Sequence, residues 1–157
     1  MEISFKYLII TGLFISAFSG CKNGGGTELA PIPDATKPTI SIVKPTAGQS
    51  FITGNTITFQ ATFSDNEKLK NYEIAINKLV LGSLTLKNVP NPIDWSYVKL
   101  LANFSPGVKQ QEINLNDIAI PLTINTNPFA TGKYNFKVTC VDASNNISVT
   151  TIEININ

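Results

Sequence analysis

Residues 132–141 read Gly-Lys-Tyr-Asn-Phe-Lys-Val-Thr-Cys-Val, and apolar and polar side chains alternate along most of this stretch. The apolar members of the alternation are Tyr134, Phe136, Val138 and Cys140. A period of two is typical of a β-strand with one buried face, because successive side chains of a strand point to opposite sides of its sheet. We therefore predict a strand over 132–141 that carries Cys140 on its buried face as a packing residue, since a buried thiol without a cationic neighbour is inert.

The same period recurs through most of the chain, and it is clearest at 56–63, where four apolar residues alternate with Thr and Gln. Turn signals rich in Gly, Asn, Asp and Ser separate the alternating runs. Residues 79–110, with three prolines, show the weakest pattern, and the strand at 84–89 is one alternative within it. The predicted strands cover 39–43, 56–63, 71–77, 84–89, 112–120, 132–141 and 147–156.

Short strands separated by turns at this spacing are typical of an antiparallel β-sandwich. Gly132-Lys133-Tyr134 resembles the tyrosine corner of immunoglobulin domains, and Phe136 stands where antibody domains place their second cysteine. Trp95 lies outside the strand at 71–77, so the Cys–Trp–Cys core of antibodies is absent. We predict an all-β, immunoglobulin-like sandwich of about seven strands over 38–157.

The N-terminus has the features of a lipoprotein signal peptide. A short segment containing Lys6 precedes the mostly apolar residues 7–18, which are fewer than the roughly 20 residues of a membrane span. Phe18-Ser19-Gly20-Cys21 resembles the lipobox cut by the lipoprotein signal peptidase. We predict a signal peptide over 1–20, followed by a lipidated Cys21 and a flexible Gly/Pro tether over 21–37. A plain secretory signal and an uncleaved anchor are the alternatives.

Composition and charge narrow the classes of function. The chain has 157 residues, 12 Lys+Arg, 11 Asp+Glu and no His, so its net charge is +1. This balance argues against a nucleic-acid partner, and the lack of His excludes His-ligated zinc and His-based catalytic triads. Lys22 follows Cys21 where an Asp would suggest retention in the inner membrane. We therefore expect an outer-membrane lipoprotein, with its periplasmic or surface exposure left open.

Several motifs carry a resemblance to a known family. They are Lys37-Pro38-Thr39-Ile40, Gly54-Asn55-Thr56-Ile57-Thr58-Phe59, Phe63-Ser64-Asp65-Asn66, Leu69-Lys70-Asn71-Tyr72-Glu73-Ile74, Ile118-Ala119-Ile120-Pro121 and Gly132-Lys133-Tyr134-Asn135-Phe136-Lys137-Val138. Together they resemble a family of Bacteroidota lipoproteins, catalogued as domain of unknown function 4625, over about residues 37–157. The resemblance implies an Ig-like sandwich on a lipid anchor with no established activity.

Acidic and amide residues fall in two predicted turns that an Ig-like fold brings to one end of the sandwich. Asp65 and Glu67 follow the strand at 56–63, and Asp142 and Asn145 follow the strand at 132–141. Two interpretations stay open, because Asp and Asn form β-turns and their oxygens also bind Ca²⁺. A calcium site requires the carboxylates of Asp65 and Asp142 to lie within about 8 Å of each other. No other cofactor is expected.

Trp95 and Tyr97 lie in a long connection between predicted strands. Aromatic rings in such places stack on sugars, contact a protein partner or cover the end of the core, and the sequence leaves these alternatives open. An enzyme of the glycoside hydrolase type would need two carboxylates facing one cleft, and no motif places Asp94, Glu112 or Asp117 in such a pair.

These observations favour a membrane-anchored envelope lipoprotein whose Ig-like domain is a non-catalytic module. It would bind a protein or adhesion partner, or serve as a scaffold. A glycan-binding accessory lipoprotein is the main alternative, and an envelope enzyme is the second.

Overall fold

A computed structural model describes residues 32–79 and 92–157 of the chain. The strands in these ranges are β1 (Thr39–Lys44), β2 (Ser50–Phe51), β3 (Thr56–Ser64), β4 (Leu69–Lys78), β5 (Ser96–Asn103), β6 (Gln110–Ala119), β7 (Thr123–Ile124), β8 (Asn127–Pro128), β9 (Gly132–Asp142) and β10 (Ile147–Ile156). Within the described part, no helix is long and apolar enough to cross a membrane.

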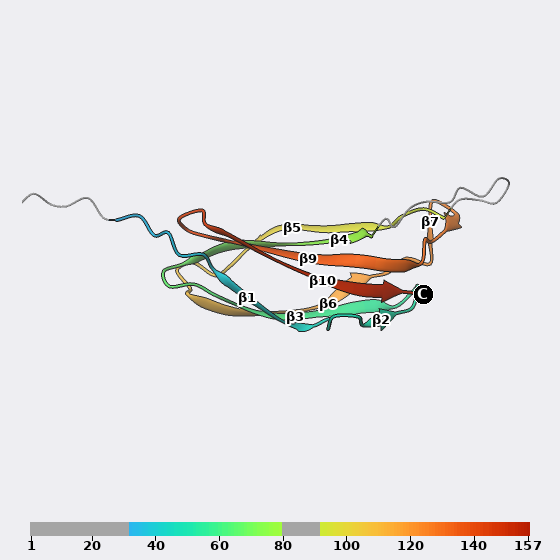
Figure 1. The fold of residues 1–157 in the computed structure, drawn as a ribbon, viewed down its shortest axis with the longest axis horizontal. Helices are drawn as coiled ribbons and strands as arrows, with labels where there is room; N and C mark the ends of the chain where they lie inside the picture. Colours follow the sequence, from blue (N-terminus) through green and yellow to red (C-terminus); the bar gives the residue numbers. More distant parts are fainter. Residues whose placement is uncertain (1–31, 80–91) are drawn as a thin grey trace, which may run out of the picture. The chain divides into compact units, whose positions relative to one another are not determined.

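Two sheets face each other across the core (Figure 1). One has the strand order β1-β3-β6 and the other has the order β2-β10-β9-β4-β5, while β7 and β8 form a small separate ladder. The pairs are antiparallel except for the short parallel contact between β2 and β10. The prediction of an all-β sandwich is confirmed, and its strand order follows the immunoglobulin pattern.

Six predicted strands correspond to β1, β3, β4, β6, β9 and β10, with ends shifted by at most two residues. The prediction missed β5, which pairs with β4 and extends the larger sheet. Its sequence, SYVKLLAN, does not alternate, so the period of two gave no signal. The predicted strand at 84–89 lies outside the described residues. The two-residue strands β2, β7 and β8 are too short to show any period.

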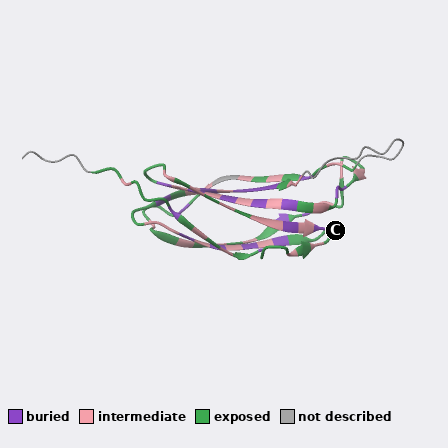
Figure 2. Ribbon diagram, in the orientation of Figure 1, coloured by how far each residue is buried: buried purple, intermediate pink, exposed green. Residues whose placement is uncertain are grey.

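The core lies between the two sheets, and Figure 2 shows buried segments along β3, β4 and β9. Burial alternates along β3 and β9 as predicted. Phe59 of β3 and Phe136 of β9 are both fully buried, and their rings stack across the two layers with centroids 5.7 Å apart. Burying aromatic rings from both sheets is the main source of stability of such a sandwich.

The predicted tyrosine corner is present at the start of β9. Tyr134 is fully buried, and its hydroxyl group donates a hydrogen bond to the carbonyl oxygen of Ala130. Burial raises the pKa of Tyr134 to about 12, which keeps the phenol protonated. Gly132 has φ = +125°, a conformation that residues with a Cβ rarely adopt, so the corner requires glycine at this position.

The compact unit that contains the sandwich begins at Ile32. The sequence predicts that residues 32–37 belong to the tether, and in the structure they precede β1 without joining a sheet. Pro38 marks the point at which the chain becomes buried, and its carbonyl oxygen accepts a hydrogen bond from the Ser148 hydroxyl group of β10. The segment before β1 therefore runs beside the start of β10.

Candidate metal centre

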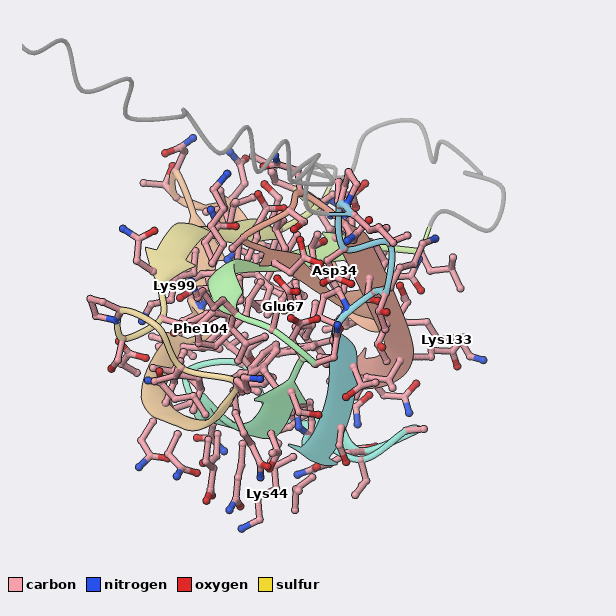
Figure 3. The ribbon with its side chains drawn as sticks, turned by 90° about the vertical axis from the view of Figure 1, so that its left-hand side faces the viewer. Asp34, Lys44, Glu67, Lys99, Phe104 and Lys133 are labelled. Carbon is pink, nitrogen blue, oxygen red and sulfur yellow. The ribbon has the colours of Figure 1, made fainter. Side chains whose placement is uncertain are left out.

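Three aspartates from distant parts of the sequence meet at one end of the sandwich. Asp65 follows β3, Asp142 ends β9, and Asp34 lies in the segment before β1. One carboxylate oxygen from each residue lies within 4.8 Å of the other two. The predicted proximity of Asp65 and Asp142 is confirmed. We call these three residues the aspartate cluster; Figure 3 looks onto the end of the sandwich that carries it and labels Asp34 and Glu67.

Asp65 is held by a turn that uses only one of its carboxylate oxygens. Its Oδ2 accepts hydrogen bonds from the backbone N–H groups of Glu67 at 2.9 Å and Lys68 at 2.8 Å. Its Oδ1 is buried, and no described residue donates a hydrogen bond to it. The turn therefore accounts for the hydrogen bonds of Oδ2 and leaves Oδ1 without a hydrogen-bond partner among the described residues.

Asp142 is completely buried. Its Oδ1 accepts a hydrogen bond from the backbone N–H of Asn146 and its Oδ2 accepts one from Asn146 Nδ2, both at 2.8 Å. A carboxylate oxygen accepts two hydrogen bonds or ligands, so each oxygen keeps an unused lone pair. Burying a carboxylate costs free energy unless a positive charge compensates it. Asp142, the most deeply buried of the three aspartates, would therefore gain the most from a bound cation.

Asp34 is attached to the sandwich by two asparagine side chains. Its Oδ1 accepts hydrogen bonds from the Thr36 backbone N–H at 2.9 Å and from Asn66 Nδ2 at 3.1 Å, and these bonds, in that order, lower the pKa of Asp34. Its backbone carbonyl oxygen accepts a bond from Asn146 Nδ2 at 3.0 Å. Its Oδ2 is buried, and no described residue donates to it.

No lysine of the described ranges forms an ion pair with the aspartate cluster. The ion pairs found there join Lys78 to Asp94, Lys99 to Asp117 and Lys133 to Glu153. Two lysines at this end of the sandwich bind neutral groups instead. Lys70 Nζ donates to Asn145 Oδ1 and Lys109 Nζ donates to the Asn66 carbonyl oxygen, both at 2.7 Å. Three carboxylates thus lie together with two unpaired buried oxygens and no ion-pair partner from these ranges.

The donor set suits a hard divalent cation. All three residues offer carboxylate oxygen, which favours Ca²⁺, Mg²⁺ or Mn²⁺ over copper or zinc. Ca²⁺ binds oxygen at about 2.3–2.6 Å, so two ligands on opposite sides of it are about 4.6–5.2 Å apart. The oxygen–oxygen distances in the aspartate cluster are at most 4.8 Å, a range that one bound Ca²⁺ can bridge. Mg²⁺ binds at about 2.0–2.1 Å and demands a near-ideal octahedral geometry.

The cluster differs in composition from the ligand set expected from sequence. It contains Asp65 and Asp142, adds Asp34, and does not include Glu67. The Glu67 side chain is exposed, and the Asn145 side-chain oxygen accepts the bond from Lys70. Sequence analysis missed Asp34 because it lies in a Pro- and Gly-rich stretch far from both turns. The role of each residue as a ligand stays a prediction.

Residues 20–157 match the model of a family described as a domain of unknown function (DUF4625). The chain belongs to this family. No curated protein matches it. Among solved structures, a β-glucosidase from Listeria innocua in complex with glucose is similar at 8% identity and a TM-score of 0.41, over 75% of this chain and 16% of the other. The sporulation control protein Spo0M from Bacillus subtilis is similar at 8% identity and a TM-score of 0.40, over 77% of this chain and 49% of the other. The chain spans about a sixth of the length of the β-glucosidase and about half of the length of Spo0M.

In this DUF4625 domain Trp95 immediately precedes β5, and Tyr97 lies within it, so the prediction that both lie in a connection was wrong for Tyr97. The side chain of Trp95 is only 8% exposed. Its ring centroid lies 5.9 Å from that of Phe129 and 6.1 Å from those of Tyr97 and Tyr134. This position fits the interpretation that Trp95 covers the end of the core. Sugar binding by the half-buried Tyr97 stays a prediction.

The predicted burial of Cys140 is confirmed. Burial, and then the charges of Asp65 and Asp142, raise the pKa of its thiol to about 12 from an ordinary value of 9.0. Iodoacetamide reacts with the thiolate, so we expect the native DUF4625 chain to resist labelling at Cys140 at pH 8 and to react fully in denaturant. Peptide mass mapping measures both. Rapid labelling of the native chain would contradict the burial.

The raised pKa of Cys140 makes the stability of the folded chain depend on pH in the alkaline range. The thiol is protonated in the folded chain up to a higher pH than in the unfolded chain. The contribution of Cys140 to the free energy of unfolding is therefore complete below about pH 9 and is lost as the pH rises towards 12.

Proposed function

We propose that this DUF4625 protein is a lipid-anchored lipoprotein of the outer membrane whose β-sandwich is a non-catalytic binding or scaffold module that binds Ca²⁺. The observation that carries the cation-binding part is the aspartate cluster with its two buried, unpaired oxygens on Asp34 and Asp65. A cation bound there would join two connections and the segment before β1. It would stiffen the end of the domain, a property suited to a scaffold or adhesion module.

The sequence around Cys21 supports the anchor. The apolar residues 7–18 and the small residues Ser19 and Gly20 before Cys21 resemble the segment that the lipoprotein signal peptidase cuts, with Phe18 where Leu is usual, and the glycines and prolines of 22–37 suit a tether. A domain held near a membrane by such a tether meets proteins of the same envelope. A protein partner is therefore the class that we propose.

The surroundings of the other carboxylates favour a non-catalytic module. Asp94 pairs with Lys78 and Asp117 pairs with Lys99, each at 3.5 Å. Glu112 accepts hydrogen bonds from Gln60 and Asn114, which lower its pKa. A general acid needs a raised pKa, so the lowered pKa of Glu112 disfavours that role.

A thermal melt of the full chain in mild detergent tests calcium binding. A ligand that binds only the folded state stabilises it by about 2.7 kcal/mol at 100 times its Kd. For a domain of this size we expect Tm to rise by about 10 °C between EDTA and saturating Ca²⁺. Titration calorimetry on the same sample measures Kd directly. We expect Mg²⁺ to give a smaller shift because it demands near-ideal octahedral geometry and gives up its bound water reluctantly.

Two variants make this test specific. In Asp65→Asn, the amide oxygen keeps the bonds to the Glu67 and Lys68 backbone while an NH₂ group replaces the unpaired oxygen, so the turn remains and a charged ligand is lost. We expect this variant to fold in EDTA and to lose most of the calcium shift. Asp94→Asn, which changes an exposed carboxylate just before β5, is the control and should keep the calcium shift. An unchanged Tm of the wild type in Ca²⁺, with no heat of binding, would refute the cation site.

A further inference from the structure

The segment that carries Asp34 has little else to hold it to the sandwich. Residues 32–37 form no strand, and all of them except Asp34 are exposed, with Ile32 exposed to 93%. Buried apolar surface therefore contributes little to its attachment. Its attachment at this end depends on polar contacts, namely the hydrogen bonds that Asn66 and Asn146 donate to Asp34.

The two other aspartates are fixed independently of this segment. Asp65 is oriented by the N–H groups of its own turn, and Asp142 is oriented by Asn146. The register of β4 with β9 places Leu69 opposite Asp142, so the two connections stay together whether or not Asp34 is present. The sandwich thus supplies two preorganised carboxylates, and the segment before β1 brings the third.

The charge on these groups makes attachment of the segment depend on a cation. With no countercharge, Asp34 approaches two other carboxylates and is repelled by both. With a divalent cation between them, the same three groups attract the ion, and the Asp34 Oδ2 gains the partner that it lacks. A ligand shifts a two-state equilibrium by its difference in affinity for the two states, and here only the attached state offers three ligands.

We propose that Ca²⁺ acts as a clasp between the segment 32–37 and the sandwich, so that binding of the ion holds this segment against the domain and loss of the ion releases it. This inference rests on the proposed calcium site and names what the site regulates. With the clasp closed, the segment is held to the sandwich at Asp34. With the clasp open, Asp34 is released and Pro38 stays attached, because its carbonyl oxygen accepts the hydrogen bond from Ser148.

The effector is thus a divalent cation, and the responding element is the segment 32–37.

Hydrogen exchange read by mass spectrometry tests the clasp on the full chain in detergent. The amides of residues 34–37 report on the segment, because Pro33 and Pro38 carry no N–H. We expect their exchange in saturating Ca²⁺ to be slower than in EDTA by about tenfold or more, while exchange in the centre of β9 stays equal. Calorimetry in the same buffers records whether the cation binds at all.

Asp34→Ala removes the segment's ligand without touching the sandwich. We expect it to weaken calcium binding by about tenfold or more and to abolish the calcium-dependent protection of 35–37. Glu67→Gln, which changes an exposed carboxylate at the same end of the sandwich, should leave both readouts unchanged. Calcium binding with no change in exchange at 34–37 would overturn the clasp and leave the proposed function intact. Lack of any binding would remove the proposed function and the clasp together.

Discussion

Replacing Phe136 with alanine is expected to lower the free energy of unfolding by about 3–5 kcal/mol. The ring is fully buried between the two sheets, where it stacks on Phe59 with centroids 5.7 Å apart. Its removal leaves a cavity at the contact that joins β9 to β3. Because small domains are stable by only about 5–15 kcal/mol, the variant should lose a large part of its stability. Denaturant unfolding in EDTA, with the wild type alongside, measures the difference.

Val149→Ala provides the matched control for this substitution. Val149 lies on β10 with its side chain 56% exposed, so its truncation should change stability by about 0.5 kcal/mol or less. A loss below about 1 kcal/mol for Phe136→Ala would contradict the interlayer contact described here.

Replacing Cys21 with serine is expected to move the protein from the membrane fraction to the soluble fraction. Each acyl CH₂ buried in the bilayer contributes about 0.8 kcal/mol, and a lipoprotein with several chains stays bound. Without the thiol, no lipid can be attached at this position. Fractionation of cells, together with mass spectrometry of the N-terminal peptide, measures location and acylation in the same sample.

Cys140→Ala is the control, because it removes the other cysteine from the core and leaves the lipidation signal unchanged. This variant should remain acylated and bound to the membrane. If the Cys21→Ser protein stays in the membrane, the apolar residues 7–18 act as an uncleaved anchor. If the wild type is already soluble and carries no lipid, the N-terminus is a plain secretory signal. Either result would refute the lipoprotein assignment.

The alternation of side chains was sufficient to locate most of the sandwich. In β3 and β9 one face packs on the core and the other meets solvent, and this difference is written into the sequence as a period of two. The tyrosine corner was also recognisable, because its glycine and tyrosine serve a local geometry. β5 was missed because its apolar residues come in adjacent runs, Tyr97-Val98 and Leu100-Leu101-Ala102, and a pattern without alternation carries no signal for which face is buried.

The aspartate cluster shows where sequence analysis ends. Asp65 and Asp142 could be predicted as neighbours, because an Ig-like topology places the two connections at the same end of the sandwich. Asp34 could not, because the chain before β1 has no period, and its position depends on hydrogen bonds from Asn66 and Asn146. The sequence by itself determined the class of fold, most of its longer strands and its candidate lipid site, since these follow from local patterns. Only the tertiary structure decided that Asp34 joins the other two aspartates, since that contact depends on a hydrogen bond between residues more than a hundred positions apart.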